Sequence, residues 1–207
     1  KRRHLNTKSD SETLIHLSPP PLEDQGGDVD TDEGFFAQLE KATRNLMLNA
    51  HGSYSVVCSM IGKGLVAFRD PHGIRPLVMG EREEDGGDKS YVIASENAGF
   101  YALGYEQVED ILPGELVFIS LAGKVFRKVI LQKEFRPCMF EKVYFSRPDA
   151  KIDDVSVYRA RLRLGQNLAN KWQEKFSDIP VDVVIPVPFT SNTAALSFAT
   201  KLGVRYS

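Results

Sequence analysis

The stretch SYSVVCSMIGKGLVAFR, residues 53–69, consists of two short runs of β-branched and apolar side chains on either side of a Gly-Lys-Gly turn. Two such runs around a glycine-containing turn are typical of an antiparallel β-hairpin. Further runs of this kind lie at 74–81, 90–95, 115–120 and 125–131. The spacing predicts an antiparallel, meander-like region over residues 51–131, with a turn at 70–73 and a short helix near 97–103.

The region before these strands has helical signals. Residues 33–48 place apolar side chains on one face of a helix. Residues 9–12, Ser-Asp-Ser-Glu, have the form of a capping box, which predicts a helix over 9–17. Residues 19–32 are acidic and nearly free of apolar side chains, as in a solvated surface loop. Helices followed by antiparallel strands predict the α+β class.

The pattern changes near residue 140. The later elements are a helix at 156–176, an apolar run at 181–187 and a helix at 193–202. A continuous apolar run is expected of a strand that is buried on both faces of a parallel sheet. Strand, short polar loop and helix, in this order, predict the start of a doubly wound α/β unit. We therefore expect two domains, 1–139 and 140–207.

Composition excludes several classes of protein. A chain of 207 residues allows one large domain or parts of two. The formal charge of −2 gives no field for holding a nucleic-acid backbone or an anionic membrane, so neither is expected as a main partner. Cys58 and Cys138 are too far apart in the sequence for a CxxC motif and fit a reducing compartment. No apolar run approaches the roughly 18 residues that span a bilayer, and the segment after Lys1 does not resemble a signal peptide.

The residues before the last helix have the clearest chemical signal. Thr190, Ser191 and Thr193 place hydroxyls at a helix N-terminus, where unpaired backbone N–H groups and the helix dipole attract anions. The carboxyl end of a parallel strand is also where such folds bind ligands. Phosphate or pyrophosphate is the expected ligand. The alternative is an ordinary N-cap, which the lack of a Gly-rich loop favours.

Other polar residues favour structural interpretations. Asp10 could bind an ammonium group, but an acid in the first turn of a helix is stabilised by the dipole, and the local pattern favours that role. Arg69 and Asp70 flank a turn, which predicts a surface or intra-turn pair rather than a catalytic dyad. Alternate residues from Arg159 to Arg163 are arginines, which predicts a solvated helix face. No histidine has a second ligand at metal-binding spacing, so no zinc site is expected.

Six segments can be compared with a known family. They are NTKSDSE (6–12), FRDPHGIRPL (68–77), ASE (94–96), FEKVYFSRPD (140–149), SVYRAR (156–161) and VVIPVP (183–188). In this order they resemble the amidophosphoribosyltransferase family, the glutamine phosphoribosylpyrophosphate amidotransferases. Several long motifs in one order are more specific than any one of them. The resemblance covers nearly the whole chain except the acidic segment around 19–32.

The resemblance implies a fold and an activity. An N-terminal-nucleophile hydrolase domain, an αββα sandwich, releases ammonia from glutamine, and a phosphoribosyltransferase domain follows it. The second domain uses the ammonia to displace pyrophosphate from phosphoribosyl pyrophosphate, which yields phosphoribosylamine in the first committed step of purine synthesis. The resemblance also implies a homo-oligomer, inhibition by purine nucleotides, Mg²⁺ and, in some members, an iron–sulfur cluster. The cytoplasm is the expected compartment, with an organelle left open.

Few functional residues can be assigned from the resemblance. Asp10 matches the aspartate that holds the α-ammonium of glutamine. Thr190 matches a hydroxyl residue associated with Mg²⁺ and the pyrophosphate end of the substrate, and Ser191 lies in the same substrate-binding loop. Cys138 matches a cluster-ligating cysteine of some members, and we expect it to be structural here. The catalytic cysteine is expected upstream of Lys1, so the chain is expected to be a fragment that is inactive alone.

One position departs from the family pattern. Phe189 stands where an acidic residue is usual, which removes a negative charge beside the expected Mg²⁺ site. This departure favours an alternative hypothesis, a non-catalytic regulatory paralogue that binds glutamine or nucleotides. A sugar-phosphate isomerising amidotransferase is a third hypothesis, and the motifs between residues 140 and 188 argue against it.

Overall fold

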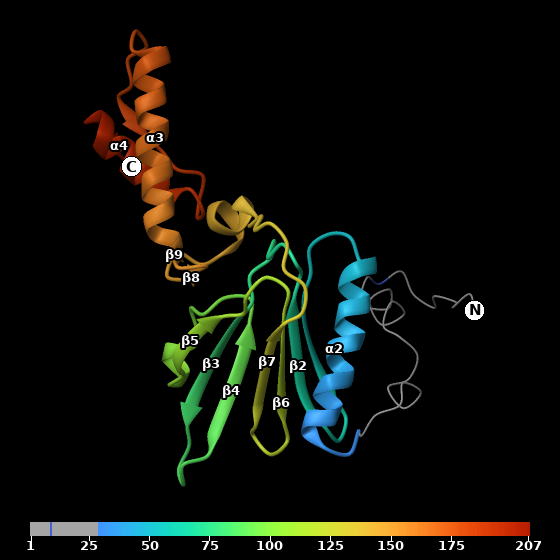
Figure 1. Cartoon of the computed structure of the whole chain (residues 1–207). Helices are drawn as coiled ribbons and strands as arrows, with labels where there is room; N and C mark the ends of the chain where they lie inside the picture. Colours follow the sequence, from blue (N-terminus) through green and yellow to red (C-terminus); the bar gives the residue numbers. More distant parts are fainter. Residues whose placement is uncertain (1–8, 10–28) are drawn as a thin grey trace. The chain divides into compact units, whose positions relative to one another are not determined.

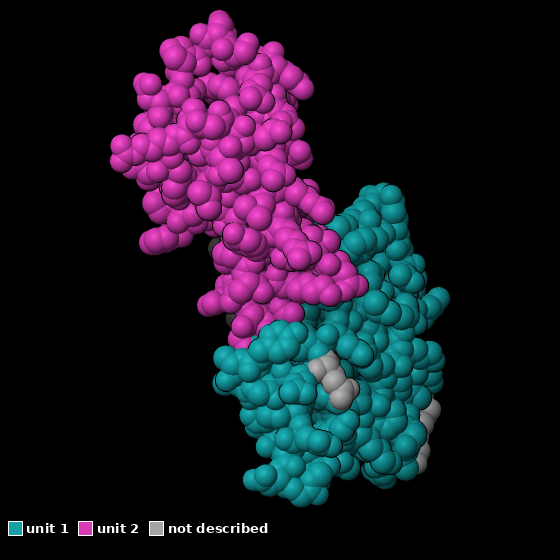
Figure 2. Space-filling model, turned by 90° about the vertical axis from the view of Figure 1, so that its left-hand side faces the viewer, with its two compact units in different colours: residues 1–95, 100–137 teal, residues 96–99, 138–207 magenta. Residues whose placement is uncertain are grey.

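The computed structural model describes Ser9 and residues 29–207, which form two compact units (Figure 2). Unit 1 contains the described residues up to Ser95 together with Phe100–Pro137, and unit 2 contains Glu96–Gly99 and Cys138–Ser207. Most of the predicted helix at 9–17, including Asp10, lies outside the described residues. Both units combine helices with strands, so the α+β class is confirmed.

Unit 1 consists of a helix and two antiparallel sheets (Figure 1). Its elements are α2 (Asp32–Asn49), β1 (Ser55–Met60), β2 (Gly64–Arg69), β3 (Val78–Glu83), β4 (Lys89–Ala94), the 3₁₀ turn η2 (Tyr101–Leu103), β5 (Glu106–Asp110), β6 (Glu115–Ser120) and β7 (Val125–Val129). One sheet has the strand order β1-β2-β6-β7 and the other the order β4-β3-β5. The predicted helix at 33–48 and the three predicted strand pairs are confirmed.

Two features of unit 1 differ from the predictions. The helix expected near 97–103 is reduced to η2, a single 3₁₀ turn. Strand β5 is absent from the predicted strands, because its sequence EQVED has one apolar residue and therefore no alternation. It pairs antiparallel with β3 across an irregular register, so its place depends on a partner strand rather than on its own pattern.

Helix α2 and the two sheets form three layers. Phe35 of α2 packs edge-to-face on Phe118 of β6, with 5.2 Å between the ring centroids. Val117, the preceding residue on β6, points to the opposite face and belongs to the same cluster as Met79 of β3. Because successive side chains of a strand alternate in direction, the central sheet supplies the core of both interfaces. Full burial of one such side chain stabilises the fold by about 1.5–3 kcal/mol.

Unit 2 contains two packed helices and short strand pairs. Its elements are the π-helical turn η3 (Glu141–Phe145), β8 (Lys151–Ile152), β9 (Val155–Ser156), α3 (Val157–Phe176), β10 (Val183–Val184), α4 (Asn192–Leu202) and β11 (Arg205–Tyr206). A Cβ on Gly165 of α3 would lie 2.1 Å from the Ala194 carbonyl oxygen of α4, so glycine permits the close approach of the helices. Ser197 Oγ donates to the Leu162 carbonyl oxygen at 2.9 Å across the same contact.

The predicted strand at 181–187 is only partly confirmed. Val183–Val184 pairs in parallel with β11, but the expected burial on both faces is wrong. The side chains of Ile185 and Val187 are 72% and 79% exposed. An apolar run is buried only where neighbouring strands and helices cover it, and β11 alone pairs with β10 among the residues that the structure describes.

Candidate functional site

The loop between β10 and α4 is part of a strand–helix–strand connection, in which α4 joins the parallel strands β10 and β11. Val183 pairs with Arg205 and Val184 with Tyr206, and α4 connects the two strands. Gly203 ends α4 with φ 72°, a left-handed conformation that glycine adopts without steric cost. Residues 185–191 therefore lie at the carboxyl end of β10 and at the N-terminus of α4, the position at which α/β folds bind ligands.

Ser191 occupies the N-cap position of α4 but does not cap the helix. Its backbone is already close to helical, with φ −85° and ψ −9°, and its side chain accepts no bond from the first turn. A capping side chain normally needs an extended backbone to reach those N–H groups. The Ser191 hydroxyl instead donates to the Val187 carbonyl oxygen at 2.5 Å. The N-cap interpretation is therefore wrong, and no described side chain caps the first turn of α4.

The rest of this loop is open to solvent. The Phe189 side chain is 88% exposed, and the Pro188–Phe189 peptide bond is cis. Thr190 is half-buried beside Ser191. Asn192 Oδ1 is shielded from solvent yet accepts no hydrogen bond from the described residues. The loop thus presents backbone amides and hydroxyls, which are groups that bind an anion.

The residues of this loop do not by themselves fit a resident metal ion. Mg²⁺ in proteins is bound by one or two carboxylates together with substrate phosphates, and residues 186–192, PVPFTSN, contain no carboxylate. Among the described residues, no group of three or more His, Cys, Asp or Glu side chains could hold a metal. Thr190 as a metal ligand stays a prediction.

The two cysteines of this chain could supply only part of the ligands of an iron–sulfur cluster, so the cluster stays a prediction. Such clusters are held by four ligands, most often thiolates, and the chain has two cysteines. Cys58 lies in β1, packs against the core of unit 1, and has a pKa raised by burial. Cys138 is a free, half-buried thiol at the start of unit 2.

Arg69 and Asp70 lie in the interior of unit 1 rather than on its surface. Their side chains are 1% and 0% exposed, so the surface part of the prediction is wrong. Arg69 donates to three backbone carbonyl oxygens, of Arg75 at 2.7 Å, Ile111 at 2.9 Å and Gly73 at 3.0 Å. Burial is possible because a guanidinium has five donors, and these carbonyls satisfy three of them.

Asp70 organises the turn that follows it. Its carboxylate accepts from the backbone N–H groups of His72 at 2.9 Å and Ile74 at 3.0 Å. The carboxylate charge also acts on Tyr54, whose pKa is raised to about 12 chiefly by burial and secondarily by Asp70. The Tyr54 hydroxyl is buried and has no hydrogen-bond partner among the described residues. The intra-turn part of the prediction is confirmed.

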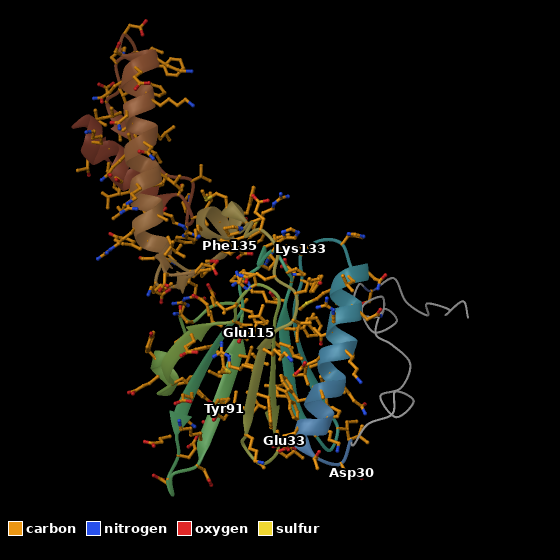
Figure 3. The ribbon with its side chains drawn as sticks, in the orientation of Figure 1. Asp30, Glu33, Tyr91, Glu115, Lys133 and Phe135 are labelled. Atoms are coloured by element: carbon orange, nitrogen blue, oxygen red, sulfur yellow. The ribbon has the colours of Figure 1, made fainter. Side chains whose placement is uncertain are left out.

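The segment after β7 runs beside this turn (Figure 3). The N–H of Lys133 donates to the Pro71 carbonyl oxygen, and that of Arg136 to the His72 carbonyl oxygen, both at 2.9 Å. A Cβ on Gly73 would lie 3.1 Å from the ring of Phe135, and Gly73 also has φ 60°. The segment after β7 therefore holds the turn both by hydrogen bonds and by packing.

Arg161 also differs from its prediction. It is 3% exposed, whereas the arginine pattern predicts a solvated helix face. Its guanidinium donates to the carbonyl oxygens of Lys142 at 2.9 Å and Ser146 at 2.7 Å, which ties the η3 segment to α3. Burial lowers the pKa of Arg161. A sequence pattern does not reveal this role, because the acceptors are backbone carbonyls of a distant segment.

Curated proteins and solved structures match the chain over nearly its whole length, whereas no protein-family model matches it. The amidophosphoribosyltransferase of Pseudomonas aeruginosa is 42% identical over 205 residues, which are 99% of this chain and 40% of that protein. The amidophosphoribosyltransferase of Escherichia coli is 42% identical over 207 residues, 100% of this chain and 40% of that protein. That of Saccharomyces cerevisiae is 41% identical over 208 residues, with 99% and 40% covered.

Two solved structures are similar in fold. The glutamine phosphoribosylpyrophosphate amidotransferase from B. subtilis, in complex with ADP and GMP, has a TM-score of 0.76 and 31% identity, with 99% of this chain and 40% of that chain covered. The allosteric regulatory enzyme of purine biosynthesis has a TM-score of 0.77 and 30% identity, with 99% and 39% covered. The expected resemblance is confirmed, and the chain spans about two fifths of the length of these relatives.

Proposed function

We propose that this chain is part of an amidophosphoribosyltransferase, which uses glutamine-derived ammonia to convert phosphoribosyl pyrophosphate to phosphoribosylamine in purine synthesis. The observation that carries the proposal is the extent of the similarity. The match at 42% identity covers 100% of this chain and therefore spans both compact units. A match confined to one unit would support only a shared glutaminase or a shared transferase.

In this proposal, unit 1 belongs to the N-terminal-nucleophile hydrolase sandwich and unit 2 begins the phosphoribosyltransferase domain. The three layers of α2 and two sheets support the first assignment, because an αββα sandwich contains such a set. The β10–α4–β11 connection between parallel strands supports the second. The division into domains 1–139 and 140–207 stays a prediction, as does the role of Asp10 in holding the glutamine ammonium group.

The loop before α4 would bind the pyrophosphate end of the substrate. The Asn192 N–H already donates to the Phe189 carbonyl oxygen, so the other N–H groups of the first turn and the Thr190 hydroxyl would supply the donors. Ser191 holds the loop through its bond to Val187. Ammonia forms a bond to the anomeric carbon while the bond to the pyrophosphate oxygen breaks, and pyrophosphate leaves with the electron pair. Negative charge grows on the leaving group, so donors fixed at that position stabilise the transition state.

The test is an assay on a protein that extends this chain to the length of its relatives. We expect glutamate release from glutamine that depends on phosphoribosyl pyrophosphate, with pyrophosphate as the second product. Ser191→Ala removes one hydrogen bond from the loop and is expected to raise the KM for phosphoribosyl pyrophosphate by about 2- to 12-fold. Thr200→Ala, which removes an exposed hydroxyl from the same helix, is the matched control. No activity in a folded protein would contradict the proposal.

The exposed Phe189 favours a second function, a non-catalytic paralogue that binds glutamine or nucleotides. The phenyl ring of Phe189 is 88% exposed in the loop before α4, and it provides no negative charge to hold the metal ion of a metal–pyrophosphate complex. Calorimetry would then detect ligand binding without turnover in the full-length protein. Phe189→Asp tests the cause, because recovery of turnover in this variant would assign the loss of activity to this position.

A further inference from the structure

The loop between β3 and β4, residues 84–88, contains the only Asp-Gly pair in the chain, Asp85-Gly86. The side-chain carboxyl of an aspartate can react with the backbone nitrogen of the next residue, because the product is a five-membered cyclic imide. A glycine in the second position reacts most readily, since no side chain hinders its nitrogen. The reaction in a folded protein requires a free carboxyl, a free backbone nitrogen and a backbone that can rotate.

The carboxylate of Asp85 is free. The side chain of the preceding residue, Glu84, accepts hydrogen bonds from Arg82 at 2.6 Å and from Ser90 at 2.5 Å. Asp85 is exposed and forms no hydrogen bond or ion pair with any residue in the part of the chain that the structure describes. The cation and the hydroxyl nearest to the loop are therefore bound to Glu84, and Asp85 is left to the solvent.

The backbone nitrogen of Gly86 is free as well. Two backbone hydrogen bonds close the loop: the Glu84 N–H donates to the Asp88 carbonyl oxygen at 2.8 Å, and the Gly87 N–H donates to the Glu84 carbonyl oxygen at 3.1 Å. Both bonds enclose Gly86, whose own N–H donates to none of the described residues. The attacking nitrogen therefore loses no hydrogen bond when it reacts.

The backbone of the loop has room to rotate. Gly86 and Gly87 have φ 105° and 87°, and a Cβ on either would meet no atom within 4 Å. The loop forms the tip of the β3–β4 hairpin, at the lower end of unit 1 in Figure 1. Glycine reaches many backbone conformations, and exposed loop tips with small residues open at little cost in free energy. No packed neighbour therefore prevents the approach of the Gly86 nitrogen to the carboxyl carbon of Asp85.

A second aspartate before a small residue is in the opposite situation. The carboxylate of Asp149 accepts from the guanidinium of Arg147 at 3.0 Å, and the N–H of Ala150 donates to the Arg147 carbonyl oxygen at 3.1 Å. Ala150 is also 1% exposed. Both reacting groups are occupied at this position, so Asp149 serves as an internal control for Asp85.

We propose that Asp85 isomerises spontaneously to isoaspartate, which makes the β3–β4 loop a site of covalent modification. The Gly86 nitrogen forms a bond to Cγ of the protonated carboxyl, and the Cγ–O bond breaks. The hydroxyl leaves as water with the amide proton. Water then opens the imide: cleavage between the nitrogen and the main-chain carbonyl carbon gives isoaspartate, and cleavage between the nitrogen and Cγ restores aspartate. The net reaction leaves the mass unchanged and consumes no other reactant.

The product changes the loop in two ways. The main chain then runs through the side-chain carbon of Asp85, which adds one backbone atom inside the turn that the Gly87 N–H and the Glu84 carbonyl oxygen close. The former main-chain carbonyl becomes a free α-carboxylate. This carboxylate is the group that isoaspartyl methyltransferases methylate, so the modified loop is expected to be a substrate for enzymes of that class.

The test ages the purified 207-residue chain at neutral pH and then labels it with a purified isoaspartyl methyltransferase. We expect label to accumulate on the tryptic peptide 83–89 and not on the tryptic peptide 143–151, which contains Asp149. A synthetic peptide of residues 82–90, aged in parallel, gives the rate without the fold. The rate in the chain is expected to lie within about tenfold of the rate in the peptide. Absence of label on 83–89, or a much slower rate in the chain, would overturn the proposal.

Three variants identify the reacting residue. Asp85→Glu keeps the charge but requires a six-membered ring, so it should abolish the label on 83–89. Asp88→Glu changes the other exposed aspartate of the same peptide and should leave the label unchanged. Gly86→Ala places a methyl group beside the attacking nitrogen and should slow labelling by about tenfold or more. Loss of label in Asp88→Glu but not in Asp85→Glu would show that the proposal names the wrong residue. Unchanged circular dichroism confirms that the variants fold.

Discussion

The turn after β2 and the loop before α4 both follow a strand and both contain a family motif, yet they are built in opposite ways. In the turn, Arg69 and Asp70 are buried, and their side chains hold five backbone groups. In the loop, Phe189 and Val187 are exposed, and the hydroxyl of Ser191 makes the side-chain hydrogen bond that holds the loop. Strong bonding at the turn stabilises unit 1, whereas weak bonding in the loop leaves donors available for a ligand.

The largest expected effect is that of Arg69→Ala. Truncation leaves three buried carbonyl oxygens without their donor and opens a cavity, which should lower the free energy of unfolding by about 3–5 kcal/mol. The midpoint of urea unfolding, followed by circular dichroism, measures the change. Arg136→Ala is the control, because Arg136 forms an ion pair with Glu134 that is exposed to solvent, and such surface pairs contribute little to stability. Equal losses in the two variants would mean that the buried turn is no more stabilising than a surface pair.

Gly114→Ala tests the same turn through the backbone. Gly114 has φ 71°, its N–H donates to the Asp70 carbonyl oxygen at 3.0 Å, and a Cβ would lie 1.9 Å from the Leu131 carbonyl oxygen. Strain and overlap together should cost about 2–4 kcal/mol. Gly123→Ala has a similar φ of 77° with open space around the Cβ, so it measures the conformational cost alone. The difference between their unfolding midpoints measures the cost of the overlap between the added Cβ and the Leu131 carbonyl oxygen.

The buried Tyr54, beside Asp70, is expected to make the stability of unit 1 depend on pH. Its pKa is raised to about 12, so the folded state favours the neutral phenol. The contribution to stability is fully present below the unfolded pKa of about 10 and is lost as the pH rises toward 12. Urea midpoints measured across this range should fall more steeply for the wild type than for Tyr54→Phe. Tyr101→Phe, at an exposed tyrosine, should leave the wild-type slope unchanged.

The smallest expected effect is that of Ser191→Ala on stability. Its hydrogen bond to Val187 lies in an exposed loop, so the free energy of unfolding should change by no more than about 0.5 kcal/mol. The same unfolding experiment measures it. A loss as large as that of Arg69→Ala would show that the loop, like the turn, is part of the scaffold, and the contrast between the two regions would be wrong.

Local patterns predict most of the elements but not the residues that hold them together. Helices α2, α3 and α4 and the strand pairs β1–β2, β3–β4 and β6–β7 follow from periodicity and turn residues. The burial of Arg161 does not, because its acceptors are the carbonyls of Lys142 and Ser146 in another segment. In the candidate site, the sequence places Thr190 and Ser191 before a helix but does not show that the Ser191 hydroxyl bonds back to Val187.

By itself, the sequence determined the α+β class, the main helices and strand pairs and the resemblance to amidophosphoribosyltransferases, because these depend on side-chain spacing and on motifs read along the chain. Only the tertiary structure decided that Arg69, Asp70 and Arg161 are buried. The physical reason is the same in each case. A charged side chain is buried or grouped according to the carbonyls and charges that distant segments bring beside it, and no local pattern contains that information.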